Sequence, residues 1–229
     1  MPTALITGTS HGLGRALAER LLADGWIVHG FARGEQTLTH DRFHNHVVDV
    51  TDEAAVRAAV AAVASSGRID LLVNNAGGAA LNAFLLTPGS VAESLMRVNY
   101  LGTFHCLQSV GKVMVRQRGG LVVNVTTVAV PLSLEGEAAY VASKAAVEAL
   151  TKVAAKELAS QGVRVIALGF GPVDTRLTRA VPASALAEVN HAIGRPQGTT
   201  MAQAVDFILS RIQDAELKSG GVEYFGQLQ

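Results

Sequence analysis

The sequence predicts an α/β protein built on a doubly wound parallel sheet, and three observations lead to this fold class. Short apolar or β-branched runs alternate with alanine-rich amphipathic stretches along most of the chain. The 229 residues are 49% hydrophobic, enough to bury one sizeable core. No segment has the composition of a domain linker. We therefore expect residues 1–229 to form a single domain, with helices flanking the sheet.

The short runs are predicted strands because each is rich in residues that pack well on a pleated sheet. In chain order, these strands are Ala4–Thr7, Ile27–Ala32, His46–Val50, Ile69–Asn74, Leu121–Thr126, Arg164–Leu168 and a last one near Gly221–Phe225.

The stretches between the strands have helical periodicity, and they are predicted helices. They are Gly14–Asp24, Asp52–Ser65, Gly89–Arg118, Glu137–Gln161 and Met201–Arg211. Thr51 is the predicted N-cap of the second helix, and Asp52 and Glu53 place negative charge at its positive end. The alternation of strand and helix makes the whole chain one Rossmann-type unit.

Charge and composition narrow the class of partner. Nineteen basic and nineteen acidic residues cancel, so neither nucleic acid nor an anionic membrane is expected to bind, and a small molecule is the better candidate. The single cysteine, Cys106, cannot form an internal disulfide, and the spacings typical of metal sites are absent, so we expect no metal. The chain shows no signal-like segment and no membrane-spanning apolar run, which favours a cytoplasmic location.

A glycine-rich segment joins the first predicted strand to the first predicted helix. It reads Thr7-Gly8-Thr9-Ser10-His11-Gly12-Leu13-Gly14. Gly8 suits the tight turn, Gly12 allows the backbone to approach a pyrophosphate, and Gly14 allows close packing of helix on strand. The helix N-terminus then faces the phosphates, to which Ser10 and His11 can add contacts.

The end of the second strand bears on the choice of cofactor. Ala32 occupies the position at which NAD-preferring enzymes place an acid on the ribose 2′-hydroxyl, and Arg33 follows it. A guanidinium can grip a 2′-phosphate bidentately, so NADP(H) is favoured. Glu35 keeps NAD(H) possible, and Arg33 could instead be a solvated loop charge.

Tyr140 and Lys144 stand four residues apart at the start of a long predicted helix, and so lie on one face of it. A free tyrosine titrates near pH 10, which is too high for a good base at neutrality, and a nearby cation stabilises the phenolate. The pair therefore predicts acid/base chemistry in which Lys144 tunes Tyr140.

Together, these motifs resemble the short-chain dehydrogenase/reductase family over nearly the entire chain. The glycine segment has that family's TGxxxGxG spacing, and Tyr140-Val141-Ala142-Ser143-Lys144 matches its catalytic motif. Asn74-Asn75-Ala76-Gly77 matches its NNAG segment beside the cofactor, and Asp49-Val50 falls where the family binds adenine.

The chain also departs from this family's pattern. Thr127 stands where a serine is usual; its hydroxyl can still donate to a substrate oxygen, but its methyl narrows the pocket. Gly169-Phe170-Gly171-Pro172-Val173-Asp174-Thr175 resembles the nicotinamide-holding N-P-G-x-x-x-T segment, with Gly169 for Asn and Phe170 for Pro. Gly221–Phe225 replaces the usual D-G-G ending.

The resemblance implies hydride transfer between a nicotinamide and a carbonyl or alcohol substrate. Tyr140 would exchange the proton, Thr127 would position the substrate oxygen, and Asn99 would hold a water that relays protons. Asn99 could instead be a buried amide bonded to the backbone. The expected cofactor-binding residues are Gly8, Ser10, His11, Gly12, Leu13, Gly14, Arg33, Asp49, Val50, Asn75, Ala76, Gly77, Tyr140, Lys144, Gly171, Val173 and Thr175.

Several functional readings stay open at this point. The segment at about 176–196 occupies the position of the family's substrate lid. The substrate is either a small ketone or aldehyde or a 3-oxoacyl group on an acyl carrier protein; a non-catalytic NADP(H)-binding redox sensor is a third reading. Arg118 and Arg179 are predicted to flank the site mouth and to attract an acidic carrier, although both could be solvated surface residues. The helices Gly89–Arg118 and Glu137–Gln161 are long and carry small residues, and the family resemblance implies that they pack against a second subunit in a homodimer or homotetramer.

Overall fold

The computed structural model describes residues 1–175, 178, 181–214 and 216–227. Its centre is a seven-stranded sheet in the order β3-β2-β1-β4-β5-β6-β7, and every pairing in it is parallel. The strands are β1 (Thr3–Thr7), β2 (Ile27–Ala32), β3 (Phe43–Val47), β4 (Leu71–Asn74), β5 (Gly120–Thr127), β6 (Val163–Phe170) and β7 (Val222–Tyr224). The predicted fold class is confirmed.

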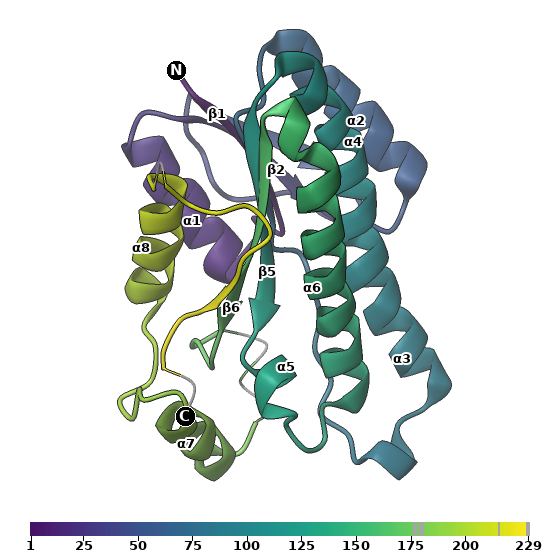
Figure 1. The fold of residues 1–229 in the computed structure, drawn as a ribbon, viewed down its shortest axis with the longest axis vertical. Coiled ribbons are helices and arrows are strands. Elements are labelled where there is room, and N and C mark those ends of the chain that lie inside the picture. The colour runs from purple at the N-terminus through teal and green to yellow at the C-terminus, as the bar shows by residue number, and fades with distance from the viewer. Residues whose placement is uncertain (176–177, 179–180, 215, 228–229) are drawn as a thin grey trace.

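Helices cover both faces of the sheet, as Figure 1 shows. One face carries α1 (Gly12–Ala23) and α8 (Met201–Ile212). The other carries α2 (Glu53–Ser66), α4 (Gly102–Gln117) and α6 (Ala138–Leu158). This arrangement follows from strands that are apolar on both sides, because each face must be covered.

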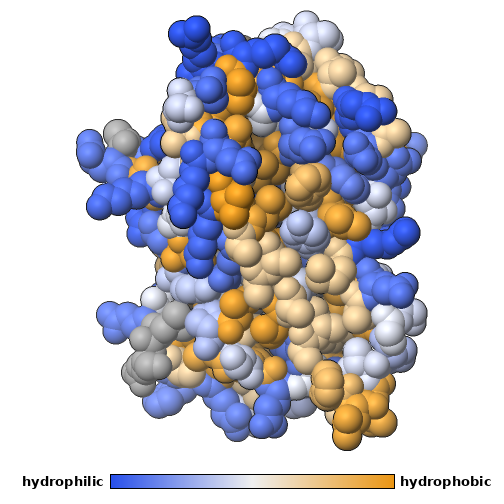
Figure 2. Space-filling view, turned by 45° about the vertical axis from the view of Figure 1, so that its right-hand side comes forward, coloured by the Kyte–Doolittle hydropathy of each residue, from blue (hydrophilic) through white to orange (hydrophobic). Residues whose placement is uncertain are grey.

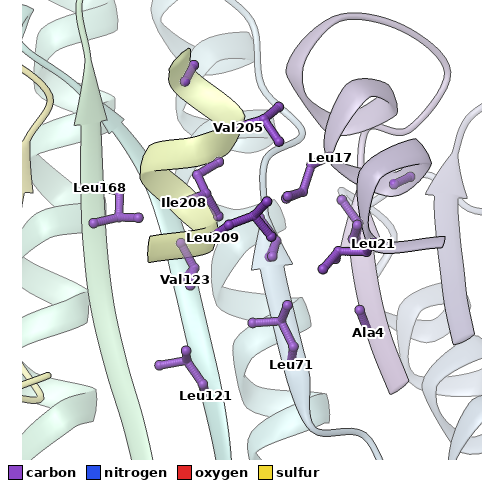
Figure 3. Close-up of a cluster of buried hydrophobic side chains, with 14 of the residues drawn as sticks. Ala4, Leu17, Leu21, Leu71, Leu121, Val123, Leu168, Val205, Ile208 and Leu209 are labelled. Carbon is purple, nitrogen blue, oxygen red and sulfur yellow. The ribbon is translucent and has the colours of Figure 1, made fainter. Parts of the chain in front are cut away.

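The core on the α1 and α8 side joins residues from distant parts of the chain. Leu17 and Leu21 of α1 meet Ile208 and Leu209 of α8 over the central strands (Figure 3). All four side chains are nearly inaccessible to solvent. Their burial fixes the helix that follows the glycine segment against the sheet.

The strand order reverses at the centre of the sheet. The chain runs outward from β1 through β2 to β3, and then crosses to β4 on the other side of β1. In open α/β sheets, ligands bind beyond the carboxyl ends of the strands at such a point. The loops after β1 and β4 are therefore the expected place for a ligand.

Two predicted boundaries near the third strand were wrong. The strand spans Phe43–Val47 rather than His46–Val50, because its pairing stops where the neighbouring β2 ends, at Ala32 opposite Val47. Val48 and Val50 are buried without being in the strand, so their apolar character reflects packing rather than pairing. The N-cap of α2 is Asp52 and not the predicted Thr51. The Asp52 carboxylate accepts a hydrogen bond from the Ala55 amide.

The predicted helix over Gly89–Arg118 has an interruption. It consists of α3 (Gly89–Leu95), a π-helical segment (Met96–Leu101) and α4, and it ends before Arg118, which has the left-handed conformation. The widened π-helical turn leaves the pattern of apolar residues unchanged, so hydrophobic periodicity could not predict it. Three short elements were not predicted from the sequence: a 3₁₀ turn at Phe84–Leu86, α5 (Ala129–Leu132) and α7 (Ala183–Ala192). A further 3₁₀ turn, Ala159–Gln161, extends α6.

Among the described residues, no helix combines the length and apolar character needed to cross a membrane. The same residues contain no group of histidine, cysteine and acidic side chains arranged to hold a metal ion.

Candidate active site

A cleft of about 1410 Å³ opens at the carboxyl ends of the strands. Seventeen of the predicted site residues line it: Gly8, Ser10, His11, Gly12, Leu13, Arg33, Asp49, Val50, Asn75, Ala76, Gly77, Thr127, Tyr140, Lys144, Gly171, Val173 and Thr175. The other two, Gly14 and Asn99, are buried and are not among the lining residues. Segments that are far apart in the sequence therefore meet in one place.

The glycine segment has the backbone that its sequence predicts. Gly8 and Gly12 have φ values of 77° and 60°, which side chains other than glycine rarely adopt. Gly14 lies under the loop, where an added Cβ would approach the Gly8 carbonyl oxygen to 2.5 Å. Each of these glycines is thus required by geometry.

The start of α1 is suited to a phosphate group. His11 is the N-cap residue, its side chain makes no capping hydrogen bond, and no acidic residue lies in the first turn. The first amide groups of this helix therefore point into the cleft without a side-chain acceptor, at the positive end of the helix dipole. Because the glycines keep the approach open, the residues present fit a dinucleotide pyrophosphate.

Asn75 fastens the loop after β4 to the glycine segment. Its side-chain amide donates to the carbonyl oxygens of Thr7 and Gly8 over 2.9 and 3.3 Å. The Thr7 hydroxyl in turn accepts from the amides of Asn75 and Ala76. The NNAG segment therefore holds the floor of the cleft in place.

Arg33 is exposed on the cleft wall directly after β2, next to the buried Ala32. Asp49 lies on the same wall, where its carboxylate accepts from the Thr51 amide over 2.9 Å and so shapes the turn into α2. The carboxyl ends of β2 and β3 thus present one guanidinium and one carboxylate to the cleft.

Thr127, Tyr140 and Lys144 meet deeper in the cleft. Burial is the main cause that raises the pKa of Tyr140 to about 12. A hydrogen bond with Thr127 lowers this pKa, and the negative charge of Glu137 raises it. Burial also lowers the pKa of Lys144 to about 8. The Lys144 ammonium donates to the Val125 carbonyl oxygen over 2.8 Å, and the tuning of Tyr140 by Lys144 stays a prediction.

A series of polar contacts fixes α6 against β5, and with it the two catalytic candidates of this helix. Glu148 and Thr151 lie one and two turns beyond Lys144. The Thr126 hydroxyl donates to Glu148 over 2.8 Å, and the Asn124 amide donates to the Thr151 hydroxyl over 2.9 Å. All of these side chains are buried. Because a register shift would leave buried polar groups unpaired, these contacts set the height of Tyr140 relative to Thr127.

Asn99 is fully buried in the π-helical segment. Its side chain accepts from the Gly78 amide and donates to both the Gly78 carbonyl oxygen and the Ser143 hydroxyl. Asn99 therefore ties the NNAG loop to α6. The alternative expectation, a buried amide bonded to the backbone, describes the Asn99 side chain in this structure. A role for Asn99 in a water relay stays a prediction.

Two differences from the family pattern, Gly169 in place of Asn and the altered chain end, fit each other in the structure. The Tyr224 ring of β7 lies against Gly169, where a Cβ would collide with it. The Tyr224 hydroxyl donates to Glu148 over 3.0 Å, while Phe170 packs edge-on to Phe207 and near Phe225. The C-terminal aromatics thus fill the space that larger residues at 169 would need.

One expected residue lies in the wrong place for its predicted role. Arg118 stands just before the amino end of β5, whereas Thr127 ends that strand. Eight strand residues at about 3.3 Å each separate them by roughly 25 Å, so Arg118 cannot flank the mouth of the cleft. Helix α4 ends at the edge of the sheet opposite the site. Arg179 lies outside the described residues.

Sequence reasoning missed several residues of the cleft. Glu137 precedes α6 and lines the cleft beside Tyr140, and Arg97, Glu135 and Glu188 line it as well. The position of Glu137, three residues before Tyr140, is a usable signal because residues at that spacing share a helix face. Glu188 had no comparable signal, since α7 was not predicted.

Residues 2–185 match the family model described as short chain dehydrogenase. The chain belongs to this family. Family membership and the similarities described below show that the chain is an NAD(P)-dependent oxidoreductase that acts on alcohol and carbonyl groups.

Known relatives cover most of the chain. A 3-oxoacyl-[acyl-carrier-protein] reductase of Staphylococcus epidermidis is 33% identical over 190 residues, which span 78% of each protein. A short chain dehydrogenase from Burkholderia cenocepacia, solved with NADP, has 29% identity and a TM-score of 0.85, covering 98% of this chain and 88% of that one. A gluconate 5-dehydrogenase from the same organism, solved with NADP and tartrate, has 27% identity and a TM-score of 0.88, covering 98% and 93%.

Proposed function

We propose that this short-chain dehydrogenase prefers NADP(H) and uses Tyr140 as its acid/base in interconverting a carbonyl compound and its alcohol. The observation that carries the proposal is the convergence of Thr127, Tyr140 and Lys144 in the cleft that also holds the glycine segment and the open start of α1.

The preference for the phosphorylated cofactor rests on the end of β2. Ala32 provides no carboxylate to repel a 2′-phosphate, and the exposed Arg33 offers a guanidinium to bind it. The two Burkholderia cenocepacia structures with NADP support the same preference. When bound, the nicotinamide supplies or accepts the hydride.

Each catalytic candidate has a role that follows from its chemistry. The Thr127 hydroxyl donates a hydrogen bond to the substrate oxygen as negative charge develops there. Tyr140 gives its phenolic proton to that oxygen during reduction and takes it back during oxidation. Because its pKa is about 12, Tyr140 is protonated at neutral pH and ready to act as the acid. Lys144 stabilises the phenolate that forms, and Asn99 with a water returns the proton.

A second candidate is the reduction of 3-oxoacyl groups on an acyl carrier protein. It is favoured by the Staphylococcus epidermidis relative, whose name gives that activity and whose similarity spans 78% of both chains. The docking role proposed for Arg118 no longer supports it.

The proposal also covers the location of the protein, its substrate lid and its oligomeric state. We place the protein in the cytoplasm, with the segment at about 176–196 as a substrate lid, since its helix α7 contributes Leu186 and Val189 to the cleft. We also propose a homodimer or homotetramer formed through the α4 and α6 side. Figure 2 shows a band of hydrophobic and weakly polar residues down one face of the molecule. Leu101, directly before α4, and Val153 of α6 are exposed.

The test is NADPH oxidation, followed by absorbance, against a panel of ketones, aldehydes and 3-oxoacyl thioesters. Tyr140→Phe is expected to lower turnover by at least about 100-fold, because it removes the acid and keeps the ring. NADPH binding, measured by fluorescence, should persist. Tyr100→Phe is the matched control, since Tyr100 is not among the residues that line the cleft. A Tyr140→Phe enzyme with wild-type turnover would contradict the assignment.

A further inference from the structure

Glu137 is an ionisable residue of the cleft to which the reaction above gives no role. It stands immediately before α6, three residues before Tyr140, and its side chain makes no capping hydrogen bond to that helix. The carboxylate is half-buried and lines the cleft. Within the described part of the chain, it has no hydrogen-bond or ion-pair partner.

Glu137 is one of three glutamates that line the cleft. The loop before α6 supplies Glu135, and α7 supplies Glu188. The lining also includes two cations from other elements: Arg97, which is exposed, and Lys144, which is buried and donates to the Val125 carbonyl oxygen. The remaining charged or titratable lining residues, His11, Arg33 and Asp49, belong to the glycine segment and to the ends of β2 and β3.

The same cleft has apolar walls. These include Leu81, Leu132, Leu134, Leu186 and Val189. Apolar walls lower the local dielectric constant, so the field of a carboxylate among them is stronger than in bulk water. Burial raises the pKa of Glu137 for this reason.

We propose that Glu137 is a specificity-determining residue that makes the cleft select neutral or cationic carbonyl substrates over anionic ones. This inference rests on the proposed carbonyl chemistry of the same cleft. An anion placed against Tyr140 would meet the negative charge of Glu137, while the nearby Lys144 ammonium donates to the Val125 carbonyl oxygen. A neutral apolar substrate meets only the apolar walls, and an ammonium group is attracted.

The effect on Tyr140 has the same electrostatic origin. A fixed negative charge disfavours the phenolate and therefore raises the tyrosine pKa, and Glu137 contributes in this direction. The tyrosine remains a good proton donor for carbonyl reduction over a wide pH range.

The kinetic test compares two substrates that differ in charge beside the same carbonyl group. These are 3-oxobutanoate, an anion, and its ethyl ester, which is neutral. The wild-type enzyme with NADPH at pH 8 should prefer the ester in kcat/KM, and Glu137→Gln should reduce this preference by about tenfold or more. Glu157→Gln is the matched control and should keep the wild-type preference, because Glu157 is exposed near the end of α6 and is not among the residues that line the cleft. An unchanged preference in Glu137→Gln, or an equal loss in both variants, would overturn the proposal.

A second measurement does not depend on turnover. The phenolate absorbance of Tyr140 is titrated in the wild type, Glu137→Gln and Glu157→Gln, and Tyr140→Phe identifies its signal among the three tyrosines. Glu137→Gln should move the Tyr140 titration to lower pH, and Glu157→Gln should leave it in place. If the wild type reduced neither substrate, the proposed function would fail, while this titration would still decide the inference. An unmoved titration in Glu137→Gln overturns it.

Discussion

At the scale of single residues, the choice between the two cofactors depends on the side chain that follows β2. Arg33 is exposed on the cleft wall, so a phosphate can reach it without any rearrangement of the core. The adjacent Ala32 is 7% exposed and has no group to bind a ribose hydroxyl. Discrimination between NADPH and NADH should therefore depend on the Arg33 guanidinium.

Arg33→Ala is expected to weaken NADPH binding by roughly tenfold or more and to leave NADH binding nearly unchanged. The reason is that a bidentate hydrogen bond to a charged group contributes about 1.5–3 kcal/mol. Titration of both cofactors by fluorescence measures the effect. Arg57→Ala on α2 serves as the control, because its side chain is 68% exposed and is not among the cleft residues. Equal binding of NADPH and NADH by the wild type would refute the preference.

The sequence carried enough information to place most of this site, and the reason is physical. Gly8, Gly12 and the Tyr140–Lys144 pair occur at spacings that only a strand–turn–helix and a helix face can use. The hydrogen-bond partners were not predictable. The bonds of Asn99 to Gly78 and Ser143 join segments 21 and 44 residues away, and no local pattern encodes such contacts.

At the scale of elements, the regular helices and strands were predictable from hydrophobic periodicity, while elements defined by pairing or by a changed helical turn were not. The bounds of β3 follow from its neighbour β2, and the π-helical segment before α4 leaves the apolar pattern intact. Likewise, Arg118 is close to Thr127 in the sequence, but the whole length of β5 separates the two residues in space.

The fit of β6 against β7 gives the second prediction. Gly169→Ala is expected to destabilise the protein by about 1–3 kcal/mol, because the new methyl group meets the Tyr224 ring in a packed region. Unfolding in urea measures this loss. In the background of Tyr224→Ala, the same change should cost less, by about 1 kcal/mol or more, since the colliding ring is gone. Additive effects of the two substitutions would show that the ring does not set the requirement for glycine at 169.

At the scale of the whole molecule, one edge of the sheet carries a group of three histidines that links stability to pH. The His29 ring of β2 stacks on His44 of β3 with 4.8 Å between ring centroids, and its Nδ1 lies 2.9 Å from Nε2 of His46. Burial lowers the pKa of His29 from 6.5 to about 4, and the neighbouring histidines add to this. The folded protein thus holds His29 uncharged where the unfolded chain would bind a proton.

This difference predicts the direction of the pH dependence. Between pH 6.5 and about 4, the unfolded chain binds a proton at His29 that the folded protein does not, so the free energy of unfolding decreases as the pH falls through this range. At about 1.4 kcal/mol per pH unit, His29 accounts for at most about 3 kcal/mol. Urea unfolding at pH 7 and pH 5 measures the loss, and His29→Asn should reduce the difference between the two conditions. His191→Asn on α7 is the control and should behave like the wild type. If His29→Asn lost as much stability between pH 7 and pH 5 as the wild type does, this edge of the sheet would not be the source of acid sensitivity.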